Sequence, residues 1–428
     1  MKVYKNPSRN EWKKLIVRPV LDNNFLRSSM VNIIDRVKKG GDASVNEFTL
    51  QFDKVRLTSL QVSQDEIIDS KNKLREDVKS AIKKAASNIR SFHKNQVTKR
   101  LDVETMQGVQ CWRKAVAIKR VGIYIPGGTA PLFSSVLMMA IPAHIAGCQE
   151  VIICTPPDQD GNVHPAILYA ASITGISKVY KVGGAQAVAA MAMGTESIPK
   201  VDKIFGPGNQ YVTAAKQIVS EMGTAIDMPA GPSELAVLAD DSANPRFIAA
   251  DLLSQAEHGV DSQVILVTTS PTLADQVGNE IEGQISDLPR RDIAEKALQN
   301  SKIILLENEK EAIDFINEYA PEHLIIQFSD VDRIAEEINN AGSVFLGNYT
   351  PESAGDYASG TNHTLPTNGA ARAYSGLSTE SFVKYITFQK ISEEGLKDLG
   401  PTIEIMAEAE ELEAHKRAVS IRLKEIDA

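Results

Sequence analysis

The sequence lacks the features that mark secreted, membrane-spanning and nucleic-acid-binding proteins. It contains three cysteines, Cys111, Cys148 and Cys154, without CxxC spacing, so we expect no disulfide framework. No run of about 18 uncharged apolar residues occurs, which disfavours a transmembrane helix. The N-terminus has no apolar centre of the signal-peptide type. A formal net charge of −9 disfavours nucleic acid or an anionic membrane as a partner. These absences favour a cytoplasmic protein.

Two common phosphate-binding motifs, GxGxxG and the Walker A loop, are also missing. Instead, three glycine turns follow strand-like runs, in the segments IPGG (125–128), VGGAQ (182–186) and GPGNQ (206–210). Such a turn can expose backbone N–H groups to a phosphate at a helix N-terminus. A strand-to-helix connection also needs glycine for backbone reasons alone. Three turns close together favour a nucleotide ligand without identifying it.

Strand-like and helix-like segments alternate along the chain after residue 116. Apolar, β-branched runs lead into helical patterns, which is typical of βαβ units. The strand-like runs cover residues 121–125, 151–154, 179–182, 203–205, 235–239, 263–268, 303–306 and 343–346. This pattern predicts an α/β fold with mostly parallel sheets. A length of 428 residues predicts two or three domains.

Three further segments have a different texture. The residues up to about 110 are charged and helical in pattern, with solvated amphipathic helices expected over 71–93. The segment 351–371 is rich in Gly, Ser, Thr and Asn and is predicted to be a loop, long enough to suggest a function. The tail, residues 404–426, is predicted to be one long charged helix.

Four of the seven histidines lie in the last two-fifths of the chain, each beside acidic or amide side chains: His258, His323, His363 and His415. Neutral imidazole together with carboxylate suits a borderline divalent cation such as zinc, and also proton transfer near neutral pH. Gln255 lies three residues before His258, so on a helix both can face one centre. These combinations favour an enzyme over a scaffold.

Each combination also has an ordinary structural interpretation. A lone His258 is more often a satisfied core residue, and Glu322 beside His323 can be a surface acid next to a buried histidine. Asp356 and His363 fit a polar loop with its own turn hydrogen bonds. His415 fits a helix-surface contact with the acid four residues before it. The residues alone leave these alternatives open.

Taken together, eight stretches resemble the histidinol dehydrogenase family. They are RVGIYIPGGTAPLFSSVLMMAIPAHIAGC (120–148), VGGAQAVAA (182–190), FGPGNQYV (205–212), DMPAGPSE (227–234), LLSQAEHG (252–259), YAPEHL (319–324), ESAGDYASGTNHTLPT (352–367) and EAHK (413–416). They follow one another in the order of the family's motifs, from residue 120 to residue 416. The segment before residue 116 is only loosely similar.

The resemblance implies a zinc-containing, NAD-dependent four-electron oxidation of L-histidinol to L-histidine through histidinaldehyde, the last step of histidine biosynthesis. It implies Glu322 and His323 as the acid–base pair. The zinc ligands it implies are Gln255, His258, Asp356 and His415. These ligands, Glu322 and His323 would also contact the substrate, together with Ser233, His363 and Glu410. The NAD contacts it implies are Tyr124, Gln186 and Asn209.

The resemblance also implies two incomplete Rossmann-like domains and a homodimer with a shared active site. We expect a helical N-terminal segment over 1–30 and a discontinuous first Rossmann-like domain over 31–115 and 235–375. We expect a second, NAD-contacting domain over 116–234, and a helical C-terminal segment over 376–428 that reaches the partner subunit. Such an exchange would explain His415, for which its own surroundings give no metal role.

Two other enzymatic activities are alternatives to histidinol oxidation, and the first is the closer one. A paralogous zinc and NAD dehydrogenase could act on another small amino alcohol or polyol, and a zinc hydrolase could use Glu322 to activate water without NAD. A nucleotide-binding regulatory protein without turnover would be a third, non-enzymatic class. Formation of NADH distinguishes a dehydrogenase from the other two.

Overall fold

The computed structural model describes residues 1–19, 23–127, 130–228 and 231–428. The chain divides into two compact units, of which the larger holds residues 1–96 and 118–382 and the smaller holds 97–117 and 383–428. Gly128, the last residue of the first predicted glycine turn, lies outside the described residues. Among the helices in the described ranges, none has the length and apolarity that a membrane span requires.

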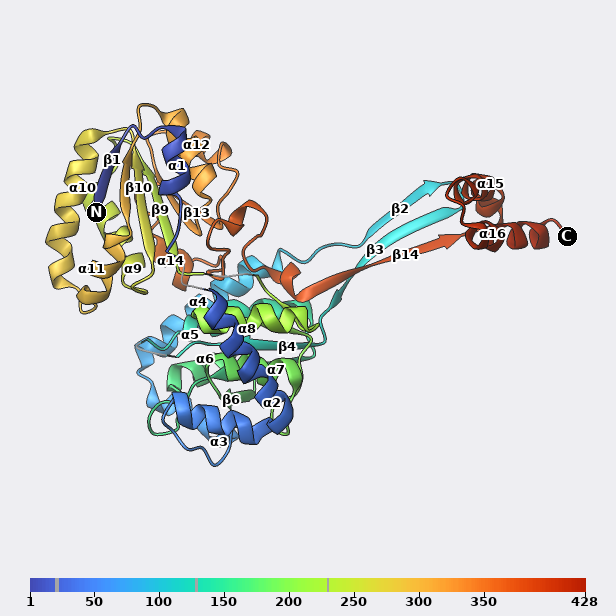
Figure 1. Cartoon of the computed structure of the whole chain (residues 1–428), viewed down its shortest axis with the longest axis horizontal. Coiled ribbons are helices and arrows are strands. Elements are labelled where there is room, and N and C mark those ends of the chain that lie inside the picture. The colour runs from blue at the N-terminus through green and yellow to red at the C-terminus, as the bar shows by residue number, and fades with distance from the viewer. Residues whose placement is uncertain (20–22, 128–129, 229–230) are drawn as a thin grey trace. The chain divides into compact units, whose positions relative to one another are not determined.

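A parallel sheet of five strands forms one part of the larger unit (Figure 1). Its order is β6-β5-β4-β7-β8, with bounds Lys178–Lys181, Glu150–Thr155, Arg120–Tyr124, Lys203–Phe205 and Ala225–Ile226. The helices that alternate with these strands are α5 (Phe133–Ala146), α6 (Pro165–Ile173), α7 (Gly184–Met193) and α8 (Gln210–Glu221). Because α5 and α7 are apolar on nearly all sides, they are buried between the sheet and further helices.

The outer helices come from the N-terminal part of the chain. The helix α4 (Glu76–Lys94) packs on α5, with Ile82 and Ile89 in the same core as the strands β4 and β5. The helix α2 (Asn23–Phe52), which is broken at Gly41, packs on α7 and α8. The short helix α3 (Gln64–Asp69) contacts α6. The five-stranded sheet is therefore covered on both faces, as a parallel sheet requires.

A second parallel sheet, of six strands, forms the other part of the larger unit. Its order is β1-β11-β10-β9-β12-β13, with bounds Lys2–Lys5, Lys302–Leu305, Gln263–Thr268, Glu234–Ala239, His323–Gln327 and Ser343–Leu346. One face packs against α9 (Pro245–Ala256), α10 (Pro271–Gln284) and α11 (Arg291–Gln299). The other packs against α1 (Arg9–Leu15), α12 (Glu309–Tyr319) and α13 (Val331–Glu336) (Figure 1). The α/β class with two mostly parallel sheets is confirmed.

The smaller unit is an antiparallel sheet followed by two helices. The sheet has the order β14-β3-β2, with bounds Val383–Ile391, Val109–Ala117 and Leu101–Met106. The helices α15 (Glu393–Ala409) and α16 (Glu413–Ile426) pack on each other where Gly400 of α15 lies beside Leu423. A Cβ atom at Gly400 would lie 2.9 Å from a methyl carbon of Leu423, so glycine permits the close approach.

The structure differs from the sequence predictions in several places. The tail is two helices, because Glu411 has a left-handed φ of 59°. Residues 101–106 and 109–117 form strands whose side chains are mostly exposed or half-buried, so they lack the alternation that a buried face imposes. The predicted loop 351–371 begins with the short helix α14 (Glu352–Tyr357). Residues 2–5 form β1 within the N-terminal segment expected to be helical, and residues 383–391 form β14 within the C-terminal segment 376–428, which was also expected to be helical.

The packing of α2 and α4 also differs from the expected division of the chain. Residues 31–115 were expected to belong with 235–375, whereas α2 and α4 cover the five-stranded sheet. An amphipathic pattern predicts that a helix has a buried face, but not which sheet buries it. The other domain boundaries stay predictions.

Candidate active site

The amino edge of the six-stranded sheet gathers most of the candidate side chains. Glu234, Gln263 and His323 are the first residues of β9, β10 and β12, which are adjacent parallel strands. The helix α9 runs back from the carboxyl end of β9 and ends at Ala256, shortly before β10 begins. Ligands of open α/β sheets usually bind at the carboxyl edge instead. The candidate site therefore uses the opposite edge.

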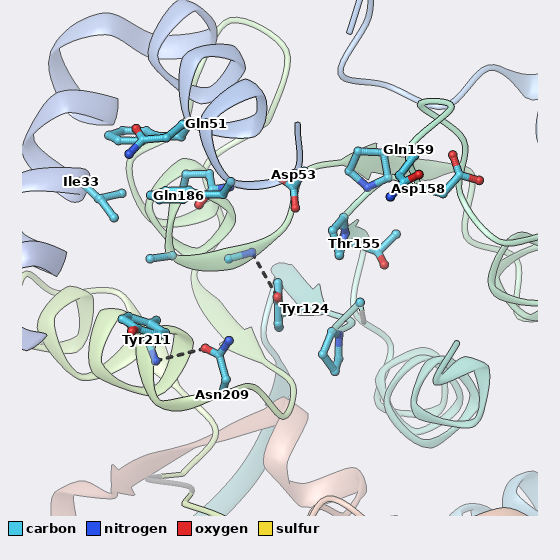
Figure 2. Close-up of a pocket in the computed structure, with 18 of the residues that line it drawn as sticks. Ile33, Gln51, Asp53, Tyr124, Thr155, Asp158, Gln159, Gln186, Asn209 and Tyr211 are labelled. Carbon is cyan, nitrogen blue, oxygen red and sulfur yellow. Dashed lines mark hydrogen bonds between the residues drawn. The ribbon is translucent and has the colours of Figure 1, made fainter. Parts of the chain in front are cut away.

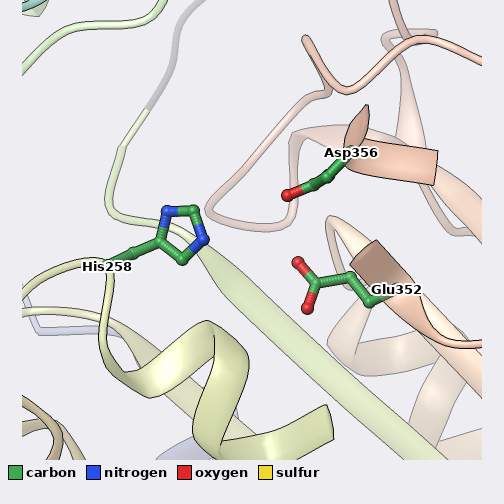
Figure 3. A group of neighbouring side chains, drawn as sticks. All are labelled: His258, Glu352 and Asp356. Carbon is green, nitrogen blue, oxygen red and sulfur yellow. The ribbon is translucent and has the colours of Figure 1, made fainter. Parts of the chain in front are cut away.

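Three side chains at this edge can hold a metal ion. His258 follows the last turn of α9, and Glu352 and Asp356 lie on α14 (Figure 3). One ligand atom from each side chain lies within 4.8 Å of the other two. One imidazole nitrogen and two carboxylate oxygens are a donor set that suits zinc and similar cations. The negative end of the α9 dipole adds to this preference for positive charge.

Gln255, in the last turn of α9, is buried against Glu352. Its amide forms hydrogen bonds only when Nε2 faces the carboxylate, with 3.3 Å to Oε2 and a second contact to Oε1. Ser254 Oγ also donates to Oε2 of Glu352, at 3.0 Å. In this orientation the amide oxygen of Gln255 is turned away from Glu352. This oxygen is the atom of the Gln255 side chain that can bind a metal ion. Glu352 therefore fixes which end of the Gln255 amide is free.

The Glu322–His323 pair is held by the backbone of one residue, Glu234. The N–H of Glu234 donates to Oε2 of Glu322 at 2.8 Å, and its carbonyl lies 3.2 Å from Nδ1 of His323. Because a carbonyl can only accept, Nδ1 of His323 carries a proton. In the neutral ring, Nε2 is then the basic nitrogen.

Burial and neighbouring charges oppose each other in this pair. Burial raises the pKa of Glu322 to about 8, although His323 and the N–H of Glu234 lower it. Burial lowers the pKa of His323, but the carboxylates of Glu322, Asp356 and Glu352 outweigh burial and raise the pKa to about 10. A cation among these carboxylates would compete with the proton on His323.

The basic nitrogen of His323 faces an acceptor. Nε2 lies 3.3 Å from Oδ1 of Asp356, and neither atom has another hydrogen-bond partner among the described residues. With a neutral imidazole, two acceptors face each other, and either a proton or a metal ion would relieve the repulsion. This unsatisfied pair is an independent sign that the residues fit a cation.

His363 and Ser233 lie at the border of this group. Nδ1 of His363 donates to the carbonyl of Asp356 at 2.8 Å, so Nε2 accepts from Ser135 Oγ at 3.0 Å. Ser233 precedes β9, and its carbonyl accepts from the N–H of Gln263 at 3.2 Å. Glu410 and His415 belong to the smaller unit, where both side chains are exposed at the ends of α15 and α16.

A cavity of about 1120 Å³ lies at the carboxyl edge of the five-stranded sheet (Figure 2). Tyr124 and Thr155 end β4 and β5 there, Gln186 lies in the first turn of α7, and Asn209 is the N-cap of α8. The three expected NAD contacts, Tyr124, Gln186 and Asn209, thus line one cavity. A volume above that of a typical drug-sized site suits a dinucleotide.

Local contacts position these side chains. The hydroxyl of Tyr124 accepts from the N–H of Gly184 at 3.1 Å, and burial raises the pKa of Tyr124 to about 12. Oδ1 of Asn209 caps α8, so its Nδ2 is the group left for a ligand. Gln186 Oε1, Thr155 Oγ1 and Asp53 Oδ2 are buried and have no hydrogen-bond partner within the part of the chain that the structure describes. Unsatisfied polar atoms around an open cavity are expected where a polar ligand binds.

Sequence reasoning missed Glu352, Glu234 and Asp53. Glu352 and Asp356 are four residues apart, a spacing that puts both on one face of a helix, but the segment was interpreted as a loop. Glu234 ends the stretch 227–234, but it contributes through its backbone, a role that the motif does not reveal. Asp53 follows α2, within the loosely similar segment before residue 116.

Known proteins resemble the chain over its full length. The family model described as histidinol dehydrogenase matches residues 17–423. A histidinol dehydrogenase of Bacteroides fragilis (strain YCH46) is 61% identical over 426 residues, covering 100% of both chains. One from Haemophilus influenzae is 50% identical over 99% of both. The crystal structure of histidinol dehydrogenase from Elizabethkingia anophelis, 54% identical, superimposes with a TM-score of 0.98 over 100% of this chain and 99% of that one. The chain belongs to the histidinol dehydrogenase family.

Proposed function

We propose that the chain oxidises L-histidinol to L-histidine in two successive NAD-dependent steps, at a zinc site shared between two subunits. Family membership supports the overall reaction, an NAD-dependent oxidation of histidinol in histidine biosynthesis. One observation supports the location of the active site. The Glu322–His323 pair, held by the Glu234 backbone, lies directly beside a donor set for a divalent cation.

The reaction removes four electrons from the carbinol carbon. The alcohol first loses a hydride and a proton and becomes an aldehyde. Water then adds to the aldehyde, and the hydrate loses a second hydride and proton to give the acid. Each NAD accepts one hydride, so two are used per histidine. The protein must therefore accept protons repeatedly without letting the aldehyde escape.

Gln255, His258 and Asp356 would hold the zinc ion together with His415 of the partner subunit. Glu352 would orient Gln255 so that its amide oxygen is available, and its own carboxylate lies close enough to ligate. A divalent cation at this position would act as a Lewis acid and anchor the substrate's nitrogen atoms. Ser233 and His363 of the same subunit would complete the substrate site, together with Glu410 of the partner subunit.

His323 would serve as the general base in both oxidations. Its Nδ1–H is committed to the Glu234 carbonyl, which fixes the tautomer and leaves Nε2 to accept the substrate's proton. Glu322, with a pKa raised to about 8 by burial, would take the proton of the attacking water. The cavity lined by Tyr124, Gln186 and Asn209 would hold NAD, the hydride acceptor.

A shared site would account for His415 and Glu410. Both are exposed on the smaller unit, and the family pattern assigns a zinc-ligand position to His415. A homodimer in which α15 and α16 reach the partner's site would supply that ligand. Isologous exchange of this kind gives two equivalent sites.

We predict that two variants separate the roles of Glu322 and His323. His323→Asn should slow both oxidations by roughly 10²–10⁴-fold, because it removes the base of each step. Glu322→Gln should mainly slow the second oxidation, because only that step needs water. Single-turnover formation of NADH from histidinol and from histidinaldehyde measures the two steps. Full-rate oxidation of the aldehyde by Glu322→Gln would contradict this division.

We also predict that Glu352→Gln weakens zinc binding by about 10–100-fold, the usual effect of losing a residue that orients a ligand. The dissociation constant is measured by competition with a chromophoric chelator. Glu257→Gln is the matched control, because it removes the same charge beside His258 but no contact to Gln255. An unchanged dissociation constant for Glu352→Gln would remove Glu352 from the metal site.

Mixing inactive variants tests the shared site. Co-expressed His258→Ala and His415→Ala chains should regain about a quarter of wild-type activity, since half of the random dimers are mixed and each holds one intact site. His258→Ala with Asp356→Ala should regain none, because both changes fall in the same half of a site. A purified, zinc-supplied mixed dimer of the first pair that stays inactive would place His415 outside the partner's site.

A further inference from the structure

The carboxylate of Glu234 is held by a residue far away in the sequence, Arg18. Both side chains are buried. Nε and Nη2 of Arg18 donate to the two carboxylate oxygens of Glu234, at 3.1 and 2.8 Å. The backbone N–H of Asn368 donates to Oε1 at 2.5 Å. A buried carboxylate is tolerated only when it is paired and hydrogen-bonded in this way.

The same guanidinium holds the segment that leads into Glu322. Its Nη2 donates to the carbonyl of Tyr319 at 2.7 Å and lies 3.4 Å from the carbonyl of Ala320. The guanidinium carbon lies 3.6 Å from the centre of the Tyr319 ring. The hydroxyl of Tyr319 donates to Gln263 at 3.0 Å. Arg18 thus joins the start of β9 to the end of α12, three residues before Glu322.

These contacts surround the backbone that holds the acid–base pair. The N–H and the carbonyl of Glu234 contact Glu322 and His323, and its side chain is fixed by Arg18. A shift of Glu234 or of residues 319–320 would change the positions of both groups at once. Arg18 touches neither the pair nor any proposed metal ligand, so it can act only through these neighbours.

We propose that Arg18 is a positioning residue for Glu322 and His323. This inference rests on the proposed function of the pair. The planar guanidinium fork of arginine is required here. It donates to both carboxylate oxygens of Glu234 and to the carbonyl of Tyr319, and it also stacks on the Tyr319 ring. Lysine carries the same charge but no such fork. The alternative is a buried ion pair that only stabilises the fold.

Arg18→Lys tests the proposal, with Arg27→Lys as the matched control. Arg27 forms a similar fork with Glu221, at 3.1 and 2.6 Å, but on the exposed surface of α2. We expect Arg18→Lys to lower kcat for histidinol about 10²-fold, the cost of a misplacement of about 1 Å. The KM for NAD and the zinc content per folded chain should stay unchanged. Arg27→Lys should keep the wild-type kcat.

A second variant tests the proposal if Arg18→Lys does not fold, and a crystal structure tests it without relying on activity. Glu234→Gln keeps the backbone contacts but weakens the fork, and it should lower kcat in the same selective way if Arg18→Lys does not fold. A crystal structure of either variant should show the Glu322 carboxylate displaced from the N–H of Glu234, now 2.8 Å away. If wild-type protein does not oxidise histidinol, the proposed function fails, but this displacement still tests positioning. Wild-type kcat in folded Arg18→Lys protein, or an undisplaced Glu322, would overturn the proposal.

Discussion

The parallel pairing of β9 with β12 is the constraint on which the candidate chemistry depends. It sets His323 opposite Leu235, so the backbone of Glu234 meets both His323 and Glu322. The N–H of Glu234 then holds the Glu322 carboxylate, and the carbonyl of Glu234 fixes the tautomer of the His323 imidazole. Residues in these central strands are held more rigidly than residues in loops, because each strand is hydrogen-bonded to a neighbour on both sides. A base that must accept protons twice in one turnover benefits from a position that does not vary.

In the larger unit, the cavity and the candidate active site lie on different sheets. One uses the carboxyl edge of its sheet, and the other uses the amino edge. The carboxyl edge of the five-stranded sheet carries the cavity with the glycine turns and Asn209. The amino edge of the six-stranded sheet carries the Glu322–His323 pair and the side chains that could hold a metal ion. Burying Glu234, Glu322 and Glu352 at that edge is costly. Arg18 offsets the charge of Glu234, and a divalent cation would offset that of Glu352 and its neighbour Asp356.

The sequence predicted the elements with strong local signals. The βαβ alternation gave the class and most strands, including residues 203–205 and 263–268 with their observed bounds. The family resemblance is confirmed, and Gln255, His258, Glu322, His323 and Asp356 prove to be neighbours within the larger unit. Their roles stay predictions. Residues 101–117 could not be identified as strands, because exposed strands lack the alternation that a buried face imposes.

Long-range contacts were beyond prediction for a different reason. Arg18 and Glu234 are 216 residues apart, and neither belongs to a pattern that marks a buried pair. The contribution of Glu234 to the site lies in its backbone, which every residue has. The choice of sheet for α2 and α4 depends on shape complementarity between surfaces, which one amphipathic pattern does not contain.

The stoichiometry of the complete reaction tests the central claim most directly. Zinc-loaded protein is given limiting histidinol and excess NAD, and NADH absorbance and histidine are followed together. The account predicts two NADH per histidine with little free aldehyde, because one base and one site serve both oxidations. One NADH per histidinol with accumulating histidinaldehyde would contradict it.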